Sequence, residues 1–417
     1  MKKLFIWFVF CAVCECFPYP ANLECYASNN CTLPKCRCMG IDIPGGYTRI
    51  ETPQMVVITF DDATNWENWD YYRYLFPPDG SRVNPNGCPI AMTLFVSNNY
   101  TDYCMVKKLH ARGMEIADHS YTHRIPRLWW ANATKEELAY EILTQRQTLA
   151  TRAGIPISDI SGWRSPYLQP GEDKVFEILS ENNFTFDATI SHPLPLDSYS
   201  QVIWPFTLDY RFNTVCHIDP CPAKTYPGFW LLPVVIVMDY REEKYCVYID
   251  SCENPPTNIE ESFHLLWKNF LRNYRTNRAP FHVNLHSSWF KQDFNLKAMD
   301  KFIKQLLTMD DVYITTVTKS LEWIKHPTPL SQLKDFDPWK CNYKSNQEDD
   351  VICEMTTDPK KLRFRLLPTS KESVLSFVFC VTVVTLTIKY YKKICWLAIS
   401  GFNTENWELG EMDDKEA

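Results

Sequence analysis

The sequence predicts an α/β fold, built either on a parallel sheet or on a (β/α) barrel. Short apolar runs alternate with amphipathic stretches over residues 54–326, and strands that alternate with helices over such a length are typical of repeated βαβ units. The chain of 417 residues is 45% hydrophobic and 22% charged. This is enough for one large core of barrel size or for two ordinary domains, and it excludes disorder as the main state.

Four segments are expected to form buried strands, because each is short, apolar, rich in β-branched residues and bounded by turn residues. They are residues 55–60 (M-V-V-I-T-F), 90–96, 280–285 and 312–317. The expected helices are amphipathic and cover residues 136–150, 173–180, 259–274 and 296–308. Thr134-Lys135-Glu136-Glu137 has the form of a capping box before the first of them. A cysteine-marked stretch, residues 191–256, is expected to be loop insertions on this scaffold.

The first 16 residues have the form of a secretory signal peptide. Lys2 and Lys3 precede the apolar run 4–13, which matches the charged and apolar regions of such a signal. An uncleaved membrane anchor is the alternative. We therefore expect the chain to enter the secretory pathway and to lie on the extracellular side.

The cysteine content fits an oxidising compartment. Of 17 cysteines, three lie in the signal and two, Cys380 and Cys395, near the C-terminus, which leaves 12. An even number in a secreted chain predicts up to six disulfides, with a pairing that the sequence does not determine. Four acceptor triplets for N-glycosylation agree with this compartment and begin at Asn30, Asn99, Asn132 and Asn183.

A short cysteine-rich segment, residues 17–46, precedes the main domain. It holds Cys25, Cys31, Cys36 and Cys38 and ends at Pro44-Gly45-Gly46. In an oxidising compartment we expect these cysteines to form disulfides with a structural role. A metal site built from all four thiolates is the alternative.

The C-terminal part carries a candidate membrane span. Residues 373–388 are uncharged and are followed by three lysines, although a span usually needs about 20 apolar residues. We expect a single transmembrane helix here, after a juxtamembrane linker (342–372) and before a short cytoplasmic tail (389–417). A buried strand or an interfacial segment is the alternative. Charges after the run argue against a GPI signal.

The composition narrows the partners. The net charge is −7, whereas proteins that bind nucleic acids usually carry an excess of positive charge, so DNA and RNA are not expected as partners. Aromatic residues reach 14%, with 14 tryptophans, which suits clefts that stack sugars as well as ordinary cores. The chain contains no G-x-S-x-G elbow and no Walker A motif, which removes the common serine esterase and phosphate-binding interpretations.

Two acidic residues end the most apolar predicted strand. Asp61 and Asp62 stand at its C-terminal end, where α/β folds place catalytic groups. Neighbouring side chains that leave a strand diverge, so one carboxylate can bind a cation while the other stays free. A role for both as turn or capping acids is the alternative.

His119-Ser120-Tyr121-Thr122-His123 places two imidazoles four residues apart. On one face of a helical turn, this spacing lets both rings reach one metal ion. The motif lacks the glutamate of H-E-x-x-H, so a metalloprotease of that class is disfavoured and the base must come from elsewhere. Asp61 is the candidate. A chance pair of surface histidines is the alternative.

Two further segments carry polar groups at loop positions. Arg164, in Gly162-Trp163-Arg164-Ser165-Pro166-Tyr167, offers a guanidinium that can hold a carboxylate by a bidentate pair. His286, in Leu285-His286-Ser287, lies at the end of another predicted strand. A single histidine there can also be a packed or capping residue.

Taken in order, these motifs resemble those of the polysaccharide deacetylases of the NodB-homology group, carbohydrate esterase family four, and the flanks resemble invertebrate chitin deacetylases. T-F-D-D is matched by residues 59–62, H-[ST]-x-x-H by 119–123, R-x-P-[FY] by 164–167, and the leucine-histidine motif by 285–286. The resemblance covers about residues 25–341. One departure is that Asp209, in the fourth motif, is followed by Tyr210, where the family commonly has tryptophan. No separate chitin-binding module is evident.

The resemblance implies a distorted (β/α) barrel of the NodB-homology type with cysteine-stapled loop insertions, over a catalytic domain of residues 47–341. It implies that Asp62, His119 and His123 hold Zn²⁺, with Co²⁺ as another possible ion. The remaining implied roles fall into two groups. Asp61 is the base oriented by Arg164, and His286 is the acid held by Asp209; Tyr167, Leu285 and Trp289 bind substrate.

The implied activity is metal-dependent removal of N-acetyl groups from chitin, chitooligosaccharides or a related N-acetylglucosamine polymer, which releases acetate and leaves glucosamine. The alternative on the same fold is a non-catalytic chitin-binding matrix protein or a membrane-tethered protein. Retention of Asp61, Asp62, His119 and His123 favours the enzyme over a binder that has lost its catalytic groups.

Overall fold

The computed structural model describes residues 23–28, 30–192, 201–212 and 216–341. The chain divides into two units, Met1–Cys353 and Glu354–Ala417, and every described residue belongs to the first. The predicted signal peptide (1–16), linker (342–372), span (373–388) and tail (389–417) lie outside the described residues. Among the helices of the described part, none has the length and apolar character needed to cross a membrane.

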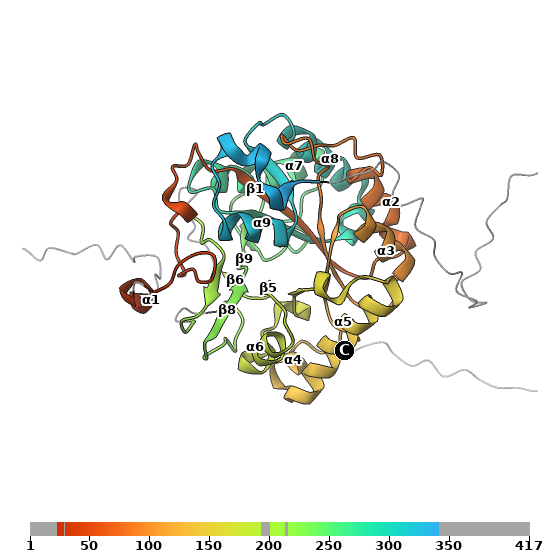
Figure 1. Ribbon diagram of the computed structural model, residues 1–417. Coiled ribbons are helices and arrows are strands. Elements are labelled where there is room, and N and C mark those ends of the chain that lie inside the picture. The colour runs from red at the N-terminus through yellow and green to blue at the C-terminus, as the bar shows by residue number, and fades with distance from the viewer. Residues whose placement is uncertain (1–22, 29, 193–200, 213–215, 342–417) are drawn as a thin grey trace, which may run out of the picture. The chain divides into compact units, whose positions relative to one another are not determined.

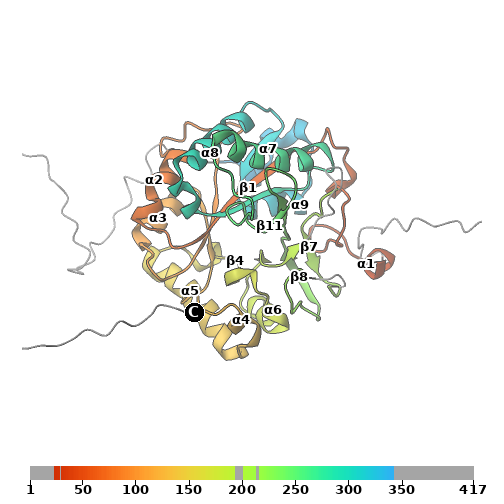
Figure 2. The same cartoon turned by 180° about the vertical axis from the view of Figure 1, so that it is seen from behind.

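A nine-stranded sheet lies at the centre of the first unit (Figure 1). The strands run in the order β12-β1-β2-β3-β4-β5-β8-β7, with β13 also paired to β1. All of these pairs are parallel except β7 with β8, which lie side by side in Figure 2. The bounds of the strands in this sheet are β1 Gln54–Asp62, β2 Thr93–Val96, β3 Glu115–Asp118, β4 Gly162–Trp163, β5 Phe186–Asp187, β7 Phe206–Leu208, β8 Tyr226–Leu231, β12 Phe281–His286 and β13 Val312–Thr315.

The sheet curves back on itself. Strands β6 (Ser191–His192) and β9 (Val234–Val235) follow β5 and β8 along the chain and pair in parallel with one another, and β9 contacts β12 at the other end of the order. The result is a distorted (β/α) barrel, which confirms the predicted fold class. A separate antiparallel pair is formed by β10 (Val237–Met238) and β11 (Tyr245–Cys246).

Strand β1 shows why the sequence folds this way. Successive side chains of a strand point to opposite faces, and those of β1 divide between two hydrophobic clusters. Met55 and Val57 belong to one cluster, while Val56, Ile58 and Phe60 belong to the other. A strand buried on both faces is a near-continuous apolar run, as the segment M-V-V-I-T-F is.

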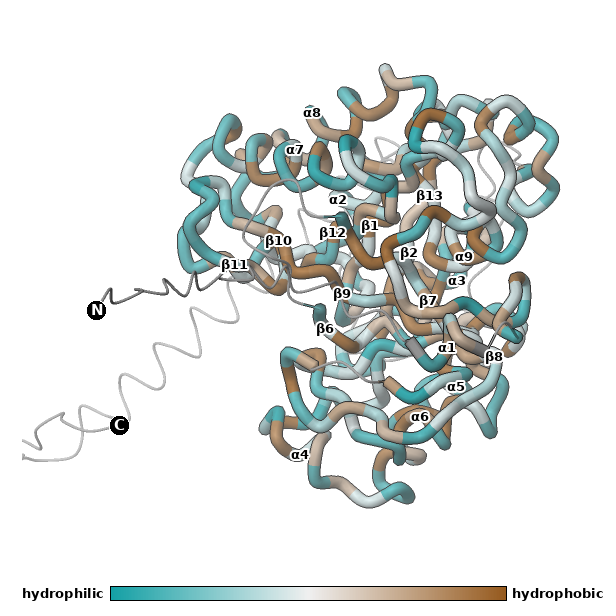
Figure 3. Tube along the Cα trace, turned by 90° about the vertical axis from the view of Figure 1, so that its left-hand side faces the viewer, coloured by the Kyte–Doolittle hydropathy of each residue, from teal (hydrophilic) through white to brown (hydrophobic). Residues whose placement is uncertain are grey.

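The helices cover the sheet with amphipathic faces. Helices α7 and α8 pack against each other, and their mixed polar and apolar colouring contrasts with the hydrophobic β9 and β10 in Figure 3. Helix α5 begins at the predicted capping box, where Thr134 and Glu137 cap each other reciprocally. The bounds of the α-helices are α1 Leu23–Ser28, α2 Trp66–Leu75, α3 Tyr103–Ala111, α4 Leu128–Asn132, α5 Lys135–Ala153, α6 Glu172–Glu181, α7 Ile259–Arg275, α8 Asp293–Leu306 and α9 Val317–Lys325.

Two expectations about the elements need correction. Strand β8 lies within the stretch expected to be loop insertions, yet it belongs to the main sheet. Its sequence, Y-P-G-F-W-L, contains a proline and a glycine, which are typical of turns, so the pattern does not predict a strand. The strand expected over residues 312–317 ends at Thr315. Helix α9 begins directly afterwards because the Thr316 side chain accepts a hydrogen bond from the backbone N–H of Lys319.

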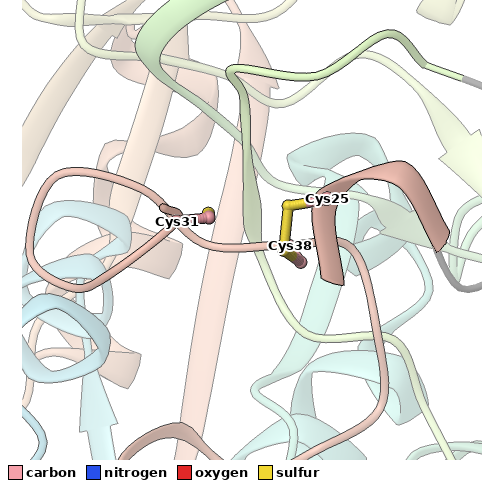
Figure 4. A group of neighbouring side chains, drawn as sticks. All are labelled: Cys25, Cys31 and Cys38. Atoms are coloured by element: carbon pink, nitrogen blue, oxygen red, sulfur yellow. A yellow bond between two sulfur atoms is a disulfide. The ribbon is translucent and has the colours of Figure 1, made fainter. Parts of the chain in front are cut away.

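Disulfides connect the described loops. The pairs are Cys25–Cys38, Cys31–Cys36, Cys88–Cys341, Cys216–Cys221 and Cys246–Cys252, and Cys104 is also disulfide-bonded. In the N-terminal segment the sulfur of Cys25 is bonded to that of Cys38 (Figure 4). All four cysteines of that segment are paired, so the prediction that they form disulfides is confirmed and a four-thiolate metal site is excluded in this state.

Candidate metal centre and active site

The polar residues singled out in the sequence meet at the carboxyl ends of the parallel strands. Asp61 and Asp62 end β1, and His286 ends β12. Asp61 and His286 are register partners across these two strands. His119 follows β3 and Arg164 follows β4. Because parallel strands bring their carboxyl ends to one edge, residues separated by more than 200 positions lie at one site.

Asp62, His119 and His123 form a compact cluster of potential metal ligands. One ligand atom from each lies within 4.8 Å of the others. The Oδ1 atom of Asp62 is 3.4 Å from Nε2 of His123 and 3.8 Å from Nε2 of His119. One carboxylate oxygen and two imidazole nitrogens are a ligand set that suits Zn²⁺ and leaves coordination positions open.

His119 is prepared for such a role by its surroundings. Its Nδ1 lies 2.8 Å from the backbone carbonyl oxygen of Arg164, so an Nδ1–H donates there and Nε2 keeps a free lone pair on the side of Asp62. Burial lowers the pKa of His119 to about 4, against the opposing charge of Asp61. The ring is therefore neutral near pH 7, the form that binds a metal.

The two histidines do not share a helical turn, so that expectation is wrong. They lie in a tight turn after β3, in which Ser120 and His123 have positive φ values of 73° and 50°. The hydroxyl of Ser120 accepts a hydrogen bond from the backbone N–H of His123 at 3.1 Å. Glu141 of α5 accepts two bonds from Thr122, at 2.7 and 2.6 Å. A hydroxyl within the motif and a carboxylate from α5 thus hold a backbone conformation that the spacing alone did not reveal.

Asp61 is a buried carboxylate beside this cluster. Its Oδ1 accepts a hydrogen bond from Nη1 of Arg164 at 2.7 Å, and its Oδ2 accepts one from the Tyr248 hydroxyl at 2.6 Å. Burial raises the pKa of Asp61, but the charge of Arg164 leads the opposing effects, which together lower it to about 2. The carboxylate is therefore ionised over the physiological range.

Arg164 holds Asp61 through a single nitrogen, which corrects the expected bidentate pair. The other donors of the guanidinium bond elsewhere: Nη2 to the side chain of Asn284 at 3.0 Å, and Nε to the carbonyl oxygen of Ala188 at 3.0 Å. The Thr59 hydroxyl also accepts from Nη1, at 2.9 Å. Arg164 follows β4, and its hydrogen bonds thereby connect the end of that strand to β1, to β12 and to the loop after β5.

His286 is paired with Asp250, and the prediction that Asp209 holds it is wrong. Nδ1 of His286 lies 2.8 Å from Oδ2 of Asp250, whereas Asp209 accepts a hydrogen bond from the backbone N–H of Gly228, next to β7. Burial lowers the pKa of His286, but the hydrogen bond and charge of Asp250 lead the effects that raise it to about 9. Its Nε2 lies 3.9 Å from Asp62, on the side of the cluster.

The three residues expected to bind substrate lie in different settings. Tyr167 is 38% exposed, and its ring centroid is 5.0 Å from that of His123. Trp289 is 8% exposed and packs against Phe290. Leu285 is wrong as a substrate contact: it is fully buried in a core cluster, on the opposite face of β12 from His286. Contacts of Tyr167 and Trp289 with substrate stay predictions.

Sequence reasoning missed Tyr248 and Asp250. Both lie in the loop between Cys246 and Cys252, which are disulfide-bonded to each other. Their only local signal in the sequence is their position between two close cysteines, in a stretch assigned to insertions. A short loop closed by a disulfide presents its side chains in fixed directions. This loop is joined to β12 by a hydrogen bond from the backbone N–H of Ile249 to the carbonyl oxygen of Asn284, at 3.0 Å.

The distorted barrel, with its polar side chains gathered at the strand ends, has the form of the NodB-homology class. A family model described as "Polysaccharide deacetylase" matches residues 49–186. "Chitin deacetylase 8" of Bombyx mori is 35% identical over 308 residues, which cover 73% of this chain and 79% of that protein. The chain belongs to the polysaccharide deacetylase family.

Two further similarities extend the comparison. "Chitin deacetylase 1" of Bombyx mori is 35% identical over 334 residues, and the match spans 76% of this chain but 60% of the length of that protein. The crystal structure of a putative polysaccharide deacetylase from Mycobacterium smegmatis aligns with a TM-score of 0.45 at 17% identity, over 69% of this chain and 95% of the other.

Proposed function

We propose that this chain is a metal-dependent N-deacetylase of chitin or a related N-acetylglucosamine polymer. The observation that carries the proposal is the grouping of Asp62, His119 and His123 beside a separate ionised carboxylate, Asp61. The two Bombyx mori relatives are named as chitin deacetylases, which supports chitin as the substrate class. Zn²⁺ is the proposed ion, with Co²⁺ as a substitute.

The three ligands fit a divalent cation because their donor atoms converge and His119 is oriented by the carbonyl oxygen of Arg164. A cation bound there would supply Lewis-acid polarisation of the acetamide carbonyl and a water of lowered pKa. Because the cation would polarise the carbonyl oxygen, the positions of the three ligands determine where the acetamide group has to bind. Tyr167, exposed beside His123, is proposed to contact the sugar ring.

Asp61 is proposed to act as the general base. Its carboxylate is ionised, is held by Arg164, and has Oδ2 on the side of His119, 3.9 Å from Nε2. From this position it removes a proton from the water that attacks the amide carbon. An amide is a poor electrophile, so removal of this proton as the bond forms is needed for a useful rate.

His286 is proposed to act as the general acid on the opposite side. Asp250 holds the Nδ1–H, so the Nε2–H is directed to the side of the cluster. With a pKa raised to about 9, the ring is protonated near pH 7 and donates its proton to the departing nitrogen. The C–N bond breaks, acetate forms, and the sugar is left with an amine.

The experiment that tests the function is acetate release from defined chitin oligomers by the purified protein, with Zn²⁺ or Co²⁺ supplied and with the metal removed by a chelator. We expect release that depends on the metal and returns when it is added back. Absence of release over a range of oligomer lengths, together with retained binding to chitin, would favour the non-catalytic alternative.

The proposed location is extracellular. The disulfides of the described residues fit an oxidising compartment, and chitin is an extracellular polymer. Attachment to the membrane through residues 373–388 stays a prediction, because that segment lies outside the described residues.

A further inference from the structure

The buried phenol of Tyr248 has no part in the mechanism above. Its hydroxyl donates to Oδ2 of Asp61 at 2.6 Å, and its ring packs with Leu168 and Val234. The ring centroid lies 5.2 Å from that of His286. Tyr248 therefore stands between the proposed base and the proposed acid.

The two oxygens of the Asp61 carboxylate have different partners. Oδ1 accepts from Arg164, and Oδ2 accepts from Tyr248. Oδ2 is also the oxygen nearer to Nε2 of His119, at 3.9 Å. A carboxylate oxygen has two lone-pair directions, so one on Oδ2 can bond the phenol while the other faces the cluster of Asp62, His119 and His123.

The loop that carries Tyr248 is fixed at several points. The Cys246–Cys252 disulfide closes it, and the backbone N–H of Tyr248 donates to the Ser251 hydroxyl at 2.9 Å. The next residue, Ile249, is bonded to the backbone of Asn284 in β12. The side chain of Asn284 accepts from Arg164, so the partners of both Asp61 oxygens are linked through one strand.

We propose that Tyr248 is a positioning residue for Asp61: its hydroxyl stops the carboxylate from rotating and keeps Oδ2 turned to the metal-ligand cluster. The same short loop holds His286 through Asp250, two residues further on, so one disulfide-closed element aligns both the base and the acid. This inference deepens the proposed function and rests on it. The bond from Arg164 restrains rotation about the Cβ–Cγ bond through Oδ1 alone, and the phenol adds a second restraint at Oδ2.

The test is Tyr248→Phe, which keeps the packed ring and removes only the hydroxyl. We expect kcat on a chitin oligomer to fall roughly ten- to hundred-fold, the size of one hydrogen bond to a charged group, with KM and metal content unchanged. Tyr245→Phe is the matched control, because Tyr245 lies in β11 directly before the loop and is 39% exposed; it should behave as wild type. An unchanged kcat in Tyr248→Phe overturns the proposal.

A role limited to folding is distinguished by a double-mutant cycle with Asp61→Asn. If Tyr248 acts through Asp61, its substitution costs little more once the base is gone. Additive losses in kcat, or a loss of bound metal in Tyr248→Phe, would overturn the positioning role.

A crystal structure of Tyr248→Phe separates this proposal from the proposed function. We expect the Asp61 carboxylate to rotate away from its wild-type orientation while Arg164 and the metal ligands stay in place. A carboxylate that keeps its orientation refutes positioning by Tyr248, whether or not the wild type deacetylates chitin. If the wild type releases no acetate and Asp61 nevertheless rotates in the variant, the proposed function fails and the positioning role stands.

Discussion

Asp250 accepts the Nδ1–H of His286 at 2.8 Å, from a loop that reaches β12 across the edge of the barrel. Burial alone lowers the pKa of His286, and the hydrogen bond and charge of Asp250 reverse this effect and raise it to about 9. The histidine thus owes its orientation to one carboxylate, which also leads the three carboxylates that raise its pKa.

Asp250→Asn should shift the alkaline limit of activity. A general acid works only while it is protonated, so loss of the carboxylate should lower the pKa of His286 toward its ordinary value of about 6.5. The high-pH limb of kcat should then move to lower pH. The measurement is kcat from pH 5 to 10 for both proteins, with Asp209→Asn as the control. A limb that moves in Asp209→Asn instead would reverse the assignment of the two aspartates.

Asp61→Asn and Asp62→Asn should separate proton transfer from metal binding. Asp61→Asn should lower kcat by roughly 10²–10⁴-fold, the usual contribution of a general base, with metal content near that of wild type. Asp62→Asn should lose metal and activity together, because it removes a ligand. Metal analysis beside acetate release checks both. Equal loss of metal in the two variants would show that Asp61 is a ligand and not the base.

Acid should destabilise the fold in part through His282. Burial leads the effects that lower the pKa of this ring to about 4, so between pH 6.5 and 4 the unfolded chain binds a proton that the folded chain does not. Stability is therefore lost as pH falls through this window. When the pH falls from 7.5 to 4, the free energy of unfolding of wild type should drop by about 2 to 4 kcal/mol more than that of His282→Gln. Urea unfolding at both pH values measures this, and a difference that does not change with pH contradicts it.

Gly162→Ala should destabilise the barrel. Gly162 lies in β4, two residues before Arg164, and a Cβ there would overlap the ring of Phe186 on β5. Overpacking of this kind costs about 1–3 kcal/mol or more. Chemical unfolding gives the size of the loss, and Ser161→Ala, the preceding residue, is the control. An unaltered stability would mean that the ring of Phe186 can move aside.

Truncation before Ser373 should release the chain from the membrane if residues 373–388 span it. The full-length chain should then be found in the membrane fraction, and the truncated chain in the medium. Fractionation of cells that express either form decides between the two. Equal secretion of both forms would refute the predicted span.

The sequence was sufficient for those parts of the site that depend on strand ends. Asp61, Asp62 and His286 could be placed because a strand buried on both faces is a conspicuous apolar run, and parallel strands end at one edge. The helices 135–153 and 259–275 were foreseen for a similar reason, since long periodic segments with capping residues are strong signals.

The rest depended on tertiary contacts that leave little local pattern. The His119–His123 pair was expected on a helix, but the chain there follows a turn held by Ser120 and Glu141. Asp250 and Tyr248 lie in a stretch without periodicity, and only the folded loop shows that they face His286 and Asp61. Asp209 was chosen as the partner of His286 by motif order, which carries no information on distance.

The register of β1 with β12 sets Asp61 directly opposite His286. A shift of one strand past the other by a single residue would exchange the two faces of the strand, and the side chain of His286 would then be buried among apolar residues. Insertions or deletions that shift the register of these two strands should therefore not be tolerated. Changes intended to alter specificity are better placed in the surrounding loops.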